Sequence, residues 1–189
     1  MTDHDAKSQI LDIGRRLYEL RLVAANDGNV SIRIGDAIWA TPTNVSKGYM
    51  TDDMLVKLTL GGDVIAGTWK PSSEIKMHLA VYRANPAIGA VVHAHPPYAT
   101  ALAAAGLPLD GTVLDETRVL LGEIPLTKNA APGTSELAEA VAAQCVAYRG
   151  TLMERHGVCT WAETAEQALF NMERIEFTAK IMFLKRGVD

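Results

Sequence analysis

Apolar residues recur along this chain with two different periods, and the change of period separates predicted helices from predicted strands. From Ile10 to Leu20 they follow each other at steps of three or four residues, which predicts an amphipathic helix. The turn sequence at 26–28 ends this helix. From Val30 to Ile34 apolar and polar residues alternate, which is typical of a strand with one buried face.

The rest of the chain continues to alternate between the two patterns. Further strands are predicted at residues 37–41, 56–60, 64–66, 88–93, 151–153 and 158–161, and further helices at 73–84, 96–105, 137–145 and from 164 onward. Ser73 is the expected N-cap of its helix, and Thr164 with Gln167 has the signature of a capping box. The strands are too short and too rich in hairpins for a purely parallel doubly wound sheet, so the pattern predicts a mixed α/β fold.

Composition narrows the class of protein. The chain has 189 residues, 48% of them hydrophobic, which predicts one folded domain over residues 1–189 rather than a disordered chain. A net charge of −4 argues against a nucleic-acid partner. The sequence lacks a run of about 20 apolar residues, and Met1–Gln9 lacks the apolar core of a secretion signal, so we expect no membrane span. Two cysteines, Cys145 and Cys159, are too few for a disulfide framework, and we expect a cytoplasmic protein.

The sequence His93-Ala94-His95 is the clearest candidate for metal binding. On a strand, residues two apart point to the same face, so both imidazoles can reach one ion. The alternative is two unrelated polar residues near a strand end. A catalytic zinc needs a third ligand, for which His156 is the best candidate because Gly157 permits a close approach. His78 lies mid-helix, where core or supporting roles are commoner, and His4 falls in a terminus expected to fray.

A second candidate site lies at the predicted start of the helix over 73–84. Glu74 is the natural acid/base group, since a helix N-terminus favours its carboxylate form. The simpler interpretation is an ordinary first-turn glutamate. Ser72 and Ser73 offer hydroxyls at the same helix start, where free N–H groups can hold an anion without any Lys or Arg.

Five motifs in order resemble one known family. They are Gly28-Asn29-Val30-Ser31, Thr41-Pro42-Thr43-Asn44, Pro71-Ser72-Ser73-Glu74, Val92-His93-Ala94-His95 and Arg155-His156-Gly157. Together they resemble the class II aldolase/adducin family, and within it most closely the members that cleave fuculose 1-phosphate. The resemblance extends from the first predicted helix to the last.

This resemblance implies a fold and a set of site residues. The fold is a three-layer αβα sandwich with a mixed, mainly antiparallel sheet, assembled as a homotetramer with active sites at subunit interfaces. The implied zinc ligands are His93, His95 and His156. Glu74 falls on the acid/base carboxylate, which also ligates the metal in the resting site. The implied phosphate-binding residues are Gly28, Asn29, Thr43, Asn44, Ser72 and Ser73.

The implied activity is a zinc-dependent aldolase, with Mn²⁺ or Co²⁺ as possible replacements for Zn²⁺. Its substrate would be a ketose 1-phosphate of the fuculose or 5-deoxypentulose kind, cleaved to dihydroxyacetone phosphate and an aldehyde. One alternative is a sugar-phosphate 4-epimerase of the family. Such epimerases typically carry Asp at the position of Glu74, so the Glu in this chain favours the aldolase. A sugar-acid phosphate decarboxylase of the family keeps Glu, so that alternative stays open. A non-catalytic adducin-like domain is the remote alternative, because adducins lack the full metal set.

Three departures from the aldolase pattern affect the substrate. Asn44 stands where the motif usually has Gly, and Asn is the best substitute in a left-handed backbone. The stretch Gly111–Leu121 contains no Tyr, the residue that fuculose-phosphate aldolases use as a proton donor from the neighbouring subunit. The chain ends at Asp189, so we expect no C-terminal tail over the site.

Overall fold

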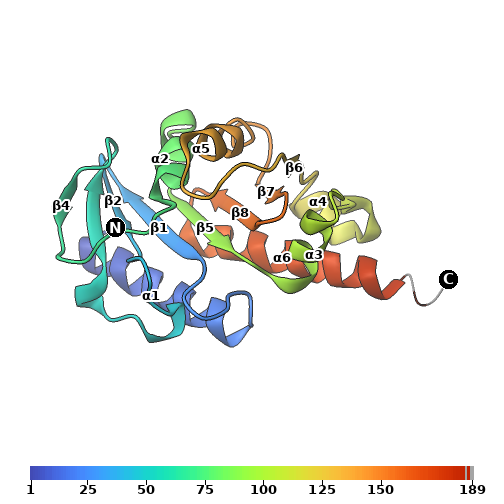
Figure 1. The fold of residues 1–189 in the computed structure, drawn as a ribbon, viewed down its shortest axis with the longest axis horizontal. Coiled ribbons are helices and arrows are strands. Elements are labelled where there is room, and N and C mark those ends of the chain that lie inside the picture. Colours follow the sequence, from blue (N-terminus) through green and yellow to red (C-terminus); the bar gives the residue numbers. More distant parts are fainter. Residues whose placement is uncertain (186, 188–189) are drawn as a thin grey trace.

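Eight strands form one sheet in the computed structural model, which describes residues 1–185 and residue 187 (Figure 1). In sheet order they are β4 (Val64–Ala66), β3 (Val56–Thr59), β2 (Ala37–Ala40), β1 (Asn29–Ile34), β5 (Ala90–Ala94), β8 (Gly157–Ala162), β7 (Gly150–Met153) and β6 (Leu126–Thr127). Strands β6 and β7 pair in parallel, and the other neighbours pair antiparallel. The sheet is therefore mixed and mainly antiparallel, as predicted.

Helices cover both faces of this sheet. One face carries α1 (Asp3–Glu19), α3 (Pro97–Ala104) and α6 (Ala165–Lys185), whose apolar residues share one core with the strands. The other face carries α2 (Ile75–Ala84) and α5 (Ser135–Ala142), which form a second core (Figure 1). The short helix α4 (Asp115–Leu120) lies against α6. This arrangement confirms the predicted three-layer αβα sandwich.

Side chains along β1 and β5 alternate between the apolar core on one face of the sheet and a buried group of polar residues on the face that α2 covers. Val30 and Val92 point into the core beneath α1 and α6. Ser31 points to the opposite face, where its Oγ lies 2.8 Å from the Tyr82 hydroxyl of α2. In the antiparallel register Asn29 stands opposite His93, and His93 stands opposite Cys159. The centre of the sheet therefore presents Asn29 and His93 side by side, on neighbouring strands.

The first helix starts earlier than its apolar pattern suggests. Helix α1 begins at Asp3, and the Thr2 side chain accepts a hydrogen bond from the Asp5 N–H while the Asp5 carboxylate accepts one from Thr2. This capping box satisfies N–H groups at the helix start. The prediction that the terminus around His4 frays is therefore wrong.

The starts of α2 and α6 also differ from the prediction. Ser73 is not the N-cap: α2 begins at Ile75, and Glu74 occupies the cap position without a side-chain capping bond. The Ser72 hydroxyl instead accepts a hydrogen bond from the Glu74 N–H at 3.3 Å, in a turn that leaves the Glu74 side chain free for other contacts. At α6, Thr164 accepts from the Gln167 N–H, whereas the Gln167 amide donates to Asn171 rather than back toward the cap.

Several elements carry no recognisable period because they are too short. Helix α4, strand β6 and the 3-10 helices Lys47–Tyr49, Asp52–Met54 and Gly111–Val113 were not predicted. Among the described residues, no helix combines the length and apolarity needed to cross a bilayer. The expectation about a C-terminal tail concerns the chain end, where residues 186, 188 and 189 lie outside the described part.

Candidate metal and active site

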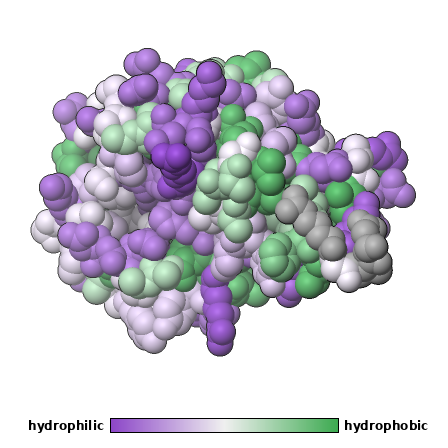
Figure 2. Space-filling model, turned by 45° about the vertical axis from the view of Figure 1, so that its right-hand side comes forward, coloured by the Kyte–Doolittle hydropathy of each residue, from purple (hydrophilic) through white to green (hydrophobic). Residues whose placement is uncertain are grey.

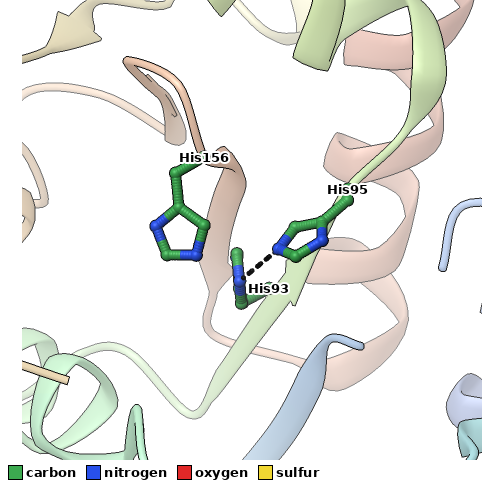
Figure 3. Close-up of side chains that lie close together, drawn as sticks. All are labelled: His93, His95 and His156. Atoms are coloured by element: carbon green, nitrogen blue, oxygen red, sulfur yellow. Dashed lines mark hydrogen bonds between the residues drawn. The ribbon is translucent and has the colours of Figure 1, made fainter. Parts of the chain in front are cut away.

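Three histidines from two separate parts of the chain converge at one end of the central strands. His93 lies on β5, His95 is the first residue after the end of that strand, and His156 lies in the turn between β7 and β8. Figure 3 shows the three rings gathered around one point, and one nitrogen of each lies within 4.8 Å of the others. His93 is completely buried, whereas His95 and His156 are partly accessible. The structure thus brings together the three histidines that the sequence proposes as metal ligands.

Hydrogen bonds to the outer ring nitrogens fix how two of these histidines face the centre. His93 Nδ1 donates to the carbonyl oxygen of Val158 at 2.9 Å, and His95 Nδ1 faces the Asp27 carboxylate at 3.3 Å. Each Nδ1 therefore carries the proton, and in the neutral rings the Nε2 lone pairs point inward. These two Nε2 atoms lie 3.2 Å apart (Figure 3). Facing lone pairs repel each other unless a proton or a cation lies between them, so this donor set fits a metal ion.

The Glu74 carboxylate contacts the histidine cluster as a fourth group. Its Oε2 lies 3.1 Å from His93 Nε2, and its Oε1 lies 3.1 Å from His156 Nε2. Burial alone would raise the pKa of this carboxyl. When no metal is bound, the positive charge of a protonated His93 and hydrogen bonds from His156 and His93 outweigh burial and hold the pKa well below its usual range. Glu74 is thus an ionised carboxylate within reach of the same centre. Three imidazoles and one carboxylate form a donor set suited to zinc.

A buried chain of hydrogen bonds holds Glu74 from behind. Asn29 Nδ2 donates to Glu74 Oε2 at 3.0 Å, and Asn29 Oδ1 accepts from His78 Nε2 at 2.6 Å. His78 Nδ1 then accepts from the Ser31 hydroxyl at 2.7 Å, which fixes the neutral tautomer of the ring. Burial lowers the pKa of His78 to about 3, so the ring stays neutral. His78 is a supporting residue that orients Asn29, and lies outside the cluster of ligand atoms.

Two glycines allow the backbone to approach the histidines closely. A Cβ on Gly157 would lie 2.5 Å from His95 Cδ2 and 2.6 Å from the Ala94 carbonyl oxygen. Gly28 has a φ of +75°, and a Cβ there would lie 2.9 Å from the His93 carbonyl oxygen. Larger side chains at either position would push against the ligands themselves. The expected close approach at Gly157 is what the structure shows.

A small polar cavity opens beside Glu74 and His95. Its volume is ≈ 130 Å³. Its walls include all six residues implied as phosphate-binding: Gly28, Asn29, Thr43, Asn44, Ser72 and Ser73. The loop after β2 and the loop before α2 lie side by side, because Thr43 N–H donates to the Lys70 carbonyl and Ser72 N–H to that of Thr41. Asn44 has a φ of +59°, the left-handed backbone expected where the motif has Gly.

The structure adds details that the sequence patterns did not reveal. The Asn29 amide is engaged by Glu74 and His78, so its side chain serves the carboxylate as well as lining the cavity. Asp27 supports His95, and Lys47 lines the cavity although it is almost completely buried. Sequence reasoning missed Asp27 and Lys47 because an acidic turn residue and a loop lysine are usually solvated.

The stretch that lacks a tyrosine lies away from this cavity. It forms the 3-10 helix Gly111–Val113 and helix α4. The Thr117 hydroxyl forms a hydrogen bond with the Thr178 hydroxyl of α6, with the two oxygens 2.7 Å apart. Asp115 and Arg118 pair with each other at the surface. In the described part of the chain, none of these residues lines the cavity. A contribution from this stretch would have to come from another copy of the chain.

Comparison with known proteins gives consistent matches over nearly the whole chain. Residues 8–183 match the model of the class II aldolase and adducin N-terminal domain. An L-fuculose phosphate aldolase of Methanococcus maripaludis is 33% identical, over 96% of this chain and 98% of the relative. A 3-oxo-tetronate 4-phosphate decarboxylase of Cupriavidus necator is also 33% identical, over 95% of this chain and 84% of the relative.

Solved structures also match over nearly the whole chain. An L-fuculose 1-phosphate aldolase matches with a TM-score of 0.90 at 29% identity, over 100% of this chain and 89% of that one. A Klebsiella pneumoniae protein described as an aldolase, epimerase or decarboxylase matches with a TM-score of 0.88 at 31% identity, over 97% of this chain and 91% of that one.

The histidine cluster predicts one tightly bound divalent ion per chain. We expect protein reconstituted with Zn²⁺ to retain about one ion after dialysis, and His156→Ala to bind it at least about tenfold more weakly, because one of three imidazole ligands is lost. Elemental analysis and competition with a chromophoric chelator measure both. His4→Ala is the matched control, because His4 is an exposed residue of the first turn of α1. Equal zinc affinity in His156→Ala and the wild type would contradict the assignment.

Proposed function

The chain belongs to the class II aldolase and adducin family, and on that premise we propose that it is a zinc-dependent lyase acting on a phosphorylated sugar. Its preferred reaction is the cleavage of a ketose 1-phosphate of the fuculose or 5-deoxypentulose kind to dihydroxyacetone phosphate and an aldehyde. The observation that carries the proposal is the convergence of His93, His95, His156 and Glu74 beside a small polar cavity. A metal and a carboxylate next to an anion-sized cavity suit this reaction class.

The residues of the site divide the work between holding a metal and moving a proton. His93, His95 and His156 would hold the metal, with Glu74 as a further ligand in the resting site. When bound, the metal supplies a Lewis acid for the negative charge that develops on the substrate's carbonyl oxygen. Imidazole ligands favour zinc, although Mn²⁺ and Co²⁺ also accept such a set.

Glu74 is the group that handles the proton at carbon. Cleavage between C3 and C4 leaves its electron pair on C3 as an enediolate, which must then be protonated at C3 to give dihydroxyacetone phosphate. As this bond breaks, the C4 hydroxyl loses its proton and C4 becomes the aldehyde carbon. Glu74, ionised in the resting site, takes up one proton from that hydroxyl or from water and delivers it to C3, and in the reverse condensation it removes the proton from C3. The hydrogen bond from Asn29 keeps the carboxylate in place, and His78 keeps Asn29 in place. A fixed carboxylate avoids the cost of reorienting during the reaction.

The cavity walls provide the hydrogen-bond donors that would bind the phosphate group and so position the substrate. The hydroxyls of Thr43, Ser72 and Ser73 and the loop backbone at Gly28 are donors suited to a phosphate group. A phosphate held there fixes the distance between the reacting carbons and Glu74.

Decarboxylation of a sugar-acid phosphate is the second candidate, and two observations favour it. Relatives described as 3-oxo-tetronate 4-phosphate decarboxylases are as similar to this chain as the aldolases are. Loss of CO₂ from such a 3-oxo acid leaves the same enediolate, and Glu74 would relay a proton from water to its carbon. It needs no group for the aldehyde oxygen, which agrees with the lack of Tyr in the stretch Gly111–Leu121.

A panel of substrates separates these reactions. We expect the zinc-loaded protein to release dihydroxyacetone phosphate from fuculose 1-phosphate or a 5-deoxypentulose 1-phosphate, measured with a coupled dehydrogenase, together with an equal amount of aldehyde. Release of CO₂ from 3-oxo-tetronate 4-phosphate without aldehyde formation would select the decarboxylase instead. Epimerised sugar phosphate as the sole product would select an epimerase, and no turnover of any substrate would contradict the lyase proposal.

Removing the charge of Glu74 tests its role separately from metal binding. We expect Glu74→Gln to keep the metal, because three imidazoles remain, and to lower kcat by roughly 10²- to 10⁴-fold, because general acid–base catalysis is lost. Glu166→Gln, an exposed change near the start of α6, is the control. Turnover by Glu74→Gln at the wild-type rate would remove Glu74 from the mechanism.

We also propose that the chain assembles as a homotetramer with active sites at the interfaces between subunits. Apolar side chains are exposed on one side of the molecule, where Phe177 and Phe183 of α6 and Val119 of α4 are each more than half exposed. Figure 2 shows hydrophobic residues gathered on this side. A groove of ≈ 760 Å³ runs along α6 beside Pro97 and Tyr98. Exposed apolar area of this kind favours association.

Light scattering during size-exclusion chromatography measures this assembly. We expect a mass four times the 20.4 kDa of the chain, and a smaller species when Phe183→Asp places a charge on the apolar side. Lys7→Asp on α1, at the opposite end of the fold, is expected to leave the mass unchanged. A wild-type protein that runs at the mass of one chain would contradict the tetramer.

The state of the cysteines supports a cytoplasmic location, which we propose for this protein. Cys145 and Cys159 are both free and buried. Burial raises the pKa of both thiols, so they stay protonated and unreactive. Free, unpaired cysteines are usual in a reducing compartment.

A further inference from the structure

Lys47 is a buried cation in the wall of the cavity. It begins the 3-10 helix Lys47–Tyr49, and only 2% of its surface is exposed. Lysine is among the residues least often buried, because moving its charge out of water is costly. A buried lysine next to a candidate binding cavity therefore needs an explanation beyond packing.

The Lys47 ammonium joins two of the loops that form the cavity, the turn before β1 and the loop after β2. Its Nζ donates to the carbonyl oxygen of Asn26 at 3.0 Å, just ahead of Gly28 and Asn29. It also donates to the carbonyl oxygen of Val45, the residue that follows Asn44. An ammonium has three N–H groups, and these two carbonyls are its acceptors within the described residues. The third N–H has no acceptor among these residues, and Lys47 lines the cavity, so this N–H can bond a ligand or water there.

The charge of Lys47 is only partly compensated by its surroundings. Burial lowers its pKa to about 8, while the nearby Asp27 carboxylate acts in the opposite direction. The ammonium therefore stays mostly protonated at neutral pH. Asp27 itself faces His95 and is 42% exposed, so it does not cancel the charge of Lys47 fully.

The other walls of the cavity provide no comparable charge. They consist of hydroxyls, amides, backbone, the ring of Pro42, the imidazole of His95 and the carboxylates of Asp27 and Glu74. Among the described residues that line it, Lys47 is the one Lys or Arg. In a chain of net charge −4, a local cation offsets these carboxylates and strengthens the binding of an anionic ligand beyond what hydroxyls and N–H groups provide.

We propose that Lys47 determines specificity for the phosphate end of the substrate, by joining two loops of the cavity and placing a positive charge against the anion. This inference rests on the proposed function, because it assumes that the cavity holds the phosphate group. A charge-assisted hydrogen bond from an ammonium is roughly twice as strong as one between neutral groups.

Binding of inorganic phosphate to the zinc-loaded protein, measured by isothermal titration calorimetry, tests the proposal without relying on turnover. We expect Lys47→Met to bind phosphate about 10- to 100-fold more weakly, because a hydrogen bond to a charged group is lost. Lys76→Met is the matched control, because it makes the same change in net charge at an exposed position just after Glu74. Lys76→Met should bind phosphate within about twofold of the wild type. Equal binding by Lys47→Met would overturn the proposal.

Lys47→Met takes away the positive charge near the Asp27 carboxylate, and a double variant is used if this change prevents folding. Asp27→Asn combined with Lys47→Met removes both charges, and thermal melting shows whether the double variant folds. Asp27→Asn alone is the reference, because it removes the same carboxylate. Weaker phosphate binding by the folded double variant than by Asp27→Asn supports the proposal, and equal binding by these two variants overturns it. Should neither variant fold, the wild type decides: added phosphate is expected to shift the NMR signal of the Lys47 side chain, and an unmoved signal overturns the proposal.

Kinetics separate this inference from the proposed function itself. With an active substrate, Lys47→Met should raise KM far more than it lowers kcat, because Lys47 holds the end of the substrate remote from the reacting carbons. If the protein cleaves no tested substrate but still binds phosphate through Lys47, the proposed function fails and this inference stands. If it is an active lyase whose phosphate affinity is independent of Lys47, only this inference fails.

Discussion

The register of three antiparallel strands is the constraint on which the site depends. Strands β1, β5 and β8 place Asn29, His93 and Cys159 abreast, and the strand period of two sends His93 toward α2 while its neighbours Val92 and Ala94 enter the core. A slip of one residue would turn His93 into the apolar core and a core residue toward Glu74. The same pairing that buries the core thus sets the distance between the carboxylate and the first imidazole.

Electrostatic compensation then explains the polar groups around that centre. Inward-facing imidazole lone pairs call for positive charge, and Glu74 brings a negative one, so a bound cation would satisfy both. The network behind Glu74 contains neutral groups throughout, since Asn29, Ser31 and neutral His78 add no net charge. On the other side of the site, the Lys47 ammonium is held by the carbonyl oxygens of Asn26 and Val45, and the nearby Asp27 carboxylate faces His95. Each charge is therefore held by groups that fix its position.

Much of this arrangement could be predicted from the sequence. The period of two identified the central strands, and the two-residue spacing of His93 and His95 put both rings on one side of β5. The glycine after His156 pointed to a close approach, which the contacts of Gly157 explain. The three-layer fold came from the resemblance carried by five motifs, and the family match over residues 8–183 confirms it.

Other features depend on contacts between residues far apart in the chain, which no local pattern records. Periodicity cannot show that an ammonium at position 47 reaches the carbonyl of residue 26, or that the Asn29 amide spans Glu74 and His78. The start of α2 was misjudged because Ser73 suits an N-cap intrinsically, whereas the turn at Ser72 moves the cap position to Glu74. Residues 126–127 are too few to show a strand period.

The cavity beside Glu74 is small, and its ≈ 130 Å³ correspond to the space of roughly four water molecules. That volume is about the size of one phosphate group, so under the proposed function the remainder of a sugar would extend beyond the cavity, past the histidine cluster. The phosphate end of a substrate would then be recognised by the cavity loops and the other end by residues outside the cavity, and these two surfaces can evolve independently. One set of loops can keep a common anionic handle while the outer surroundings diversify, which offers a physical route by which enzymes with one fold come to act on different sugars.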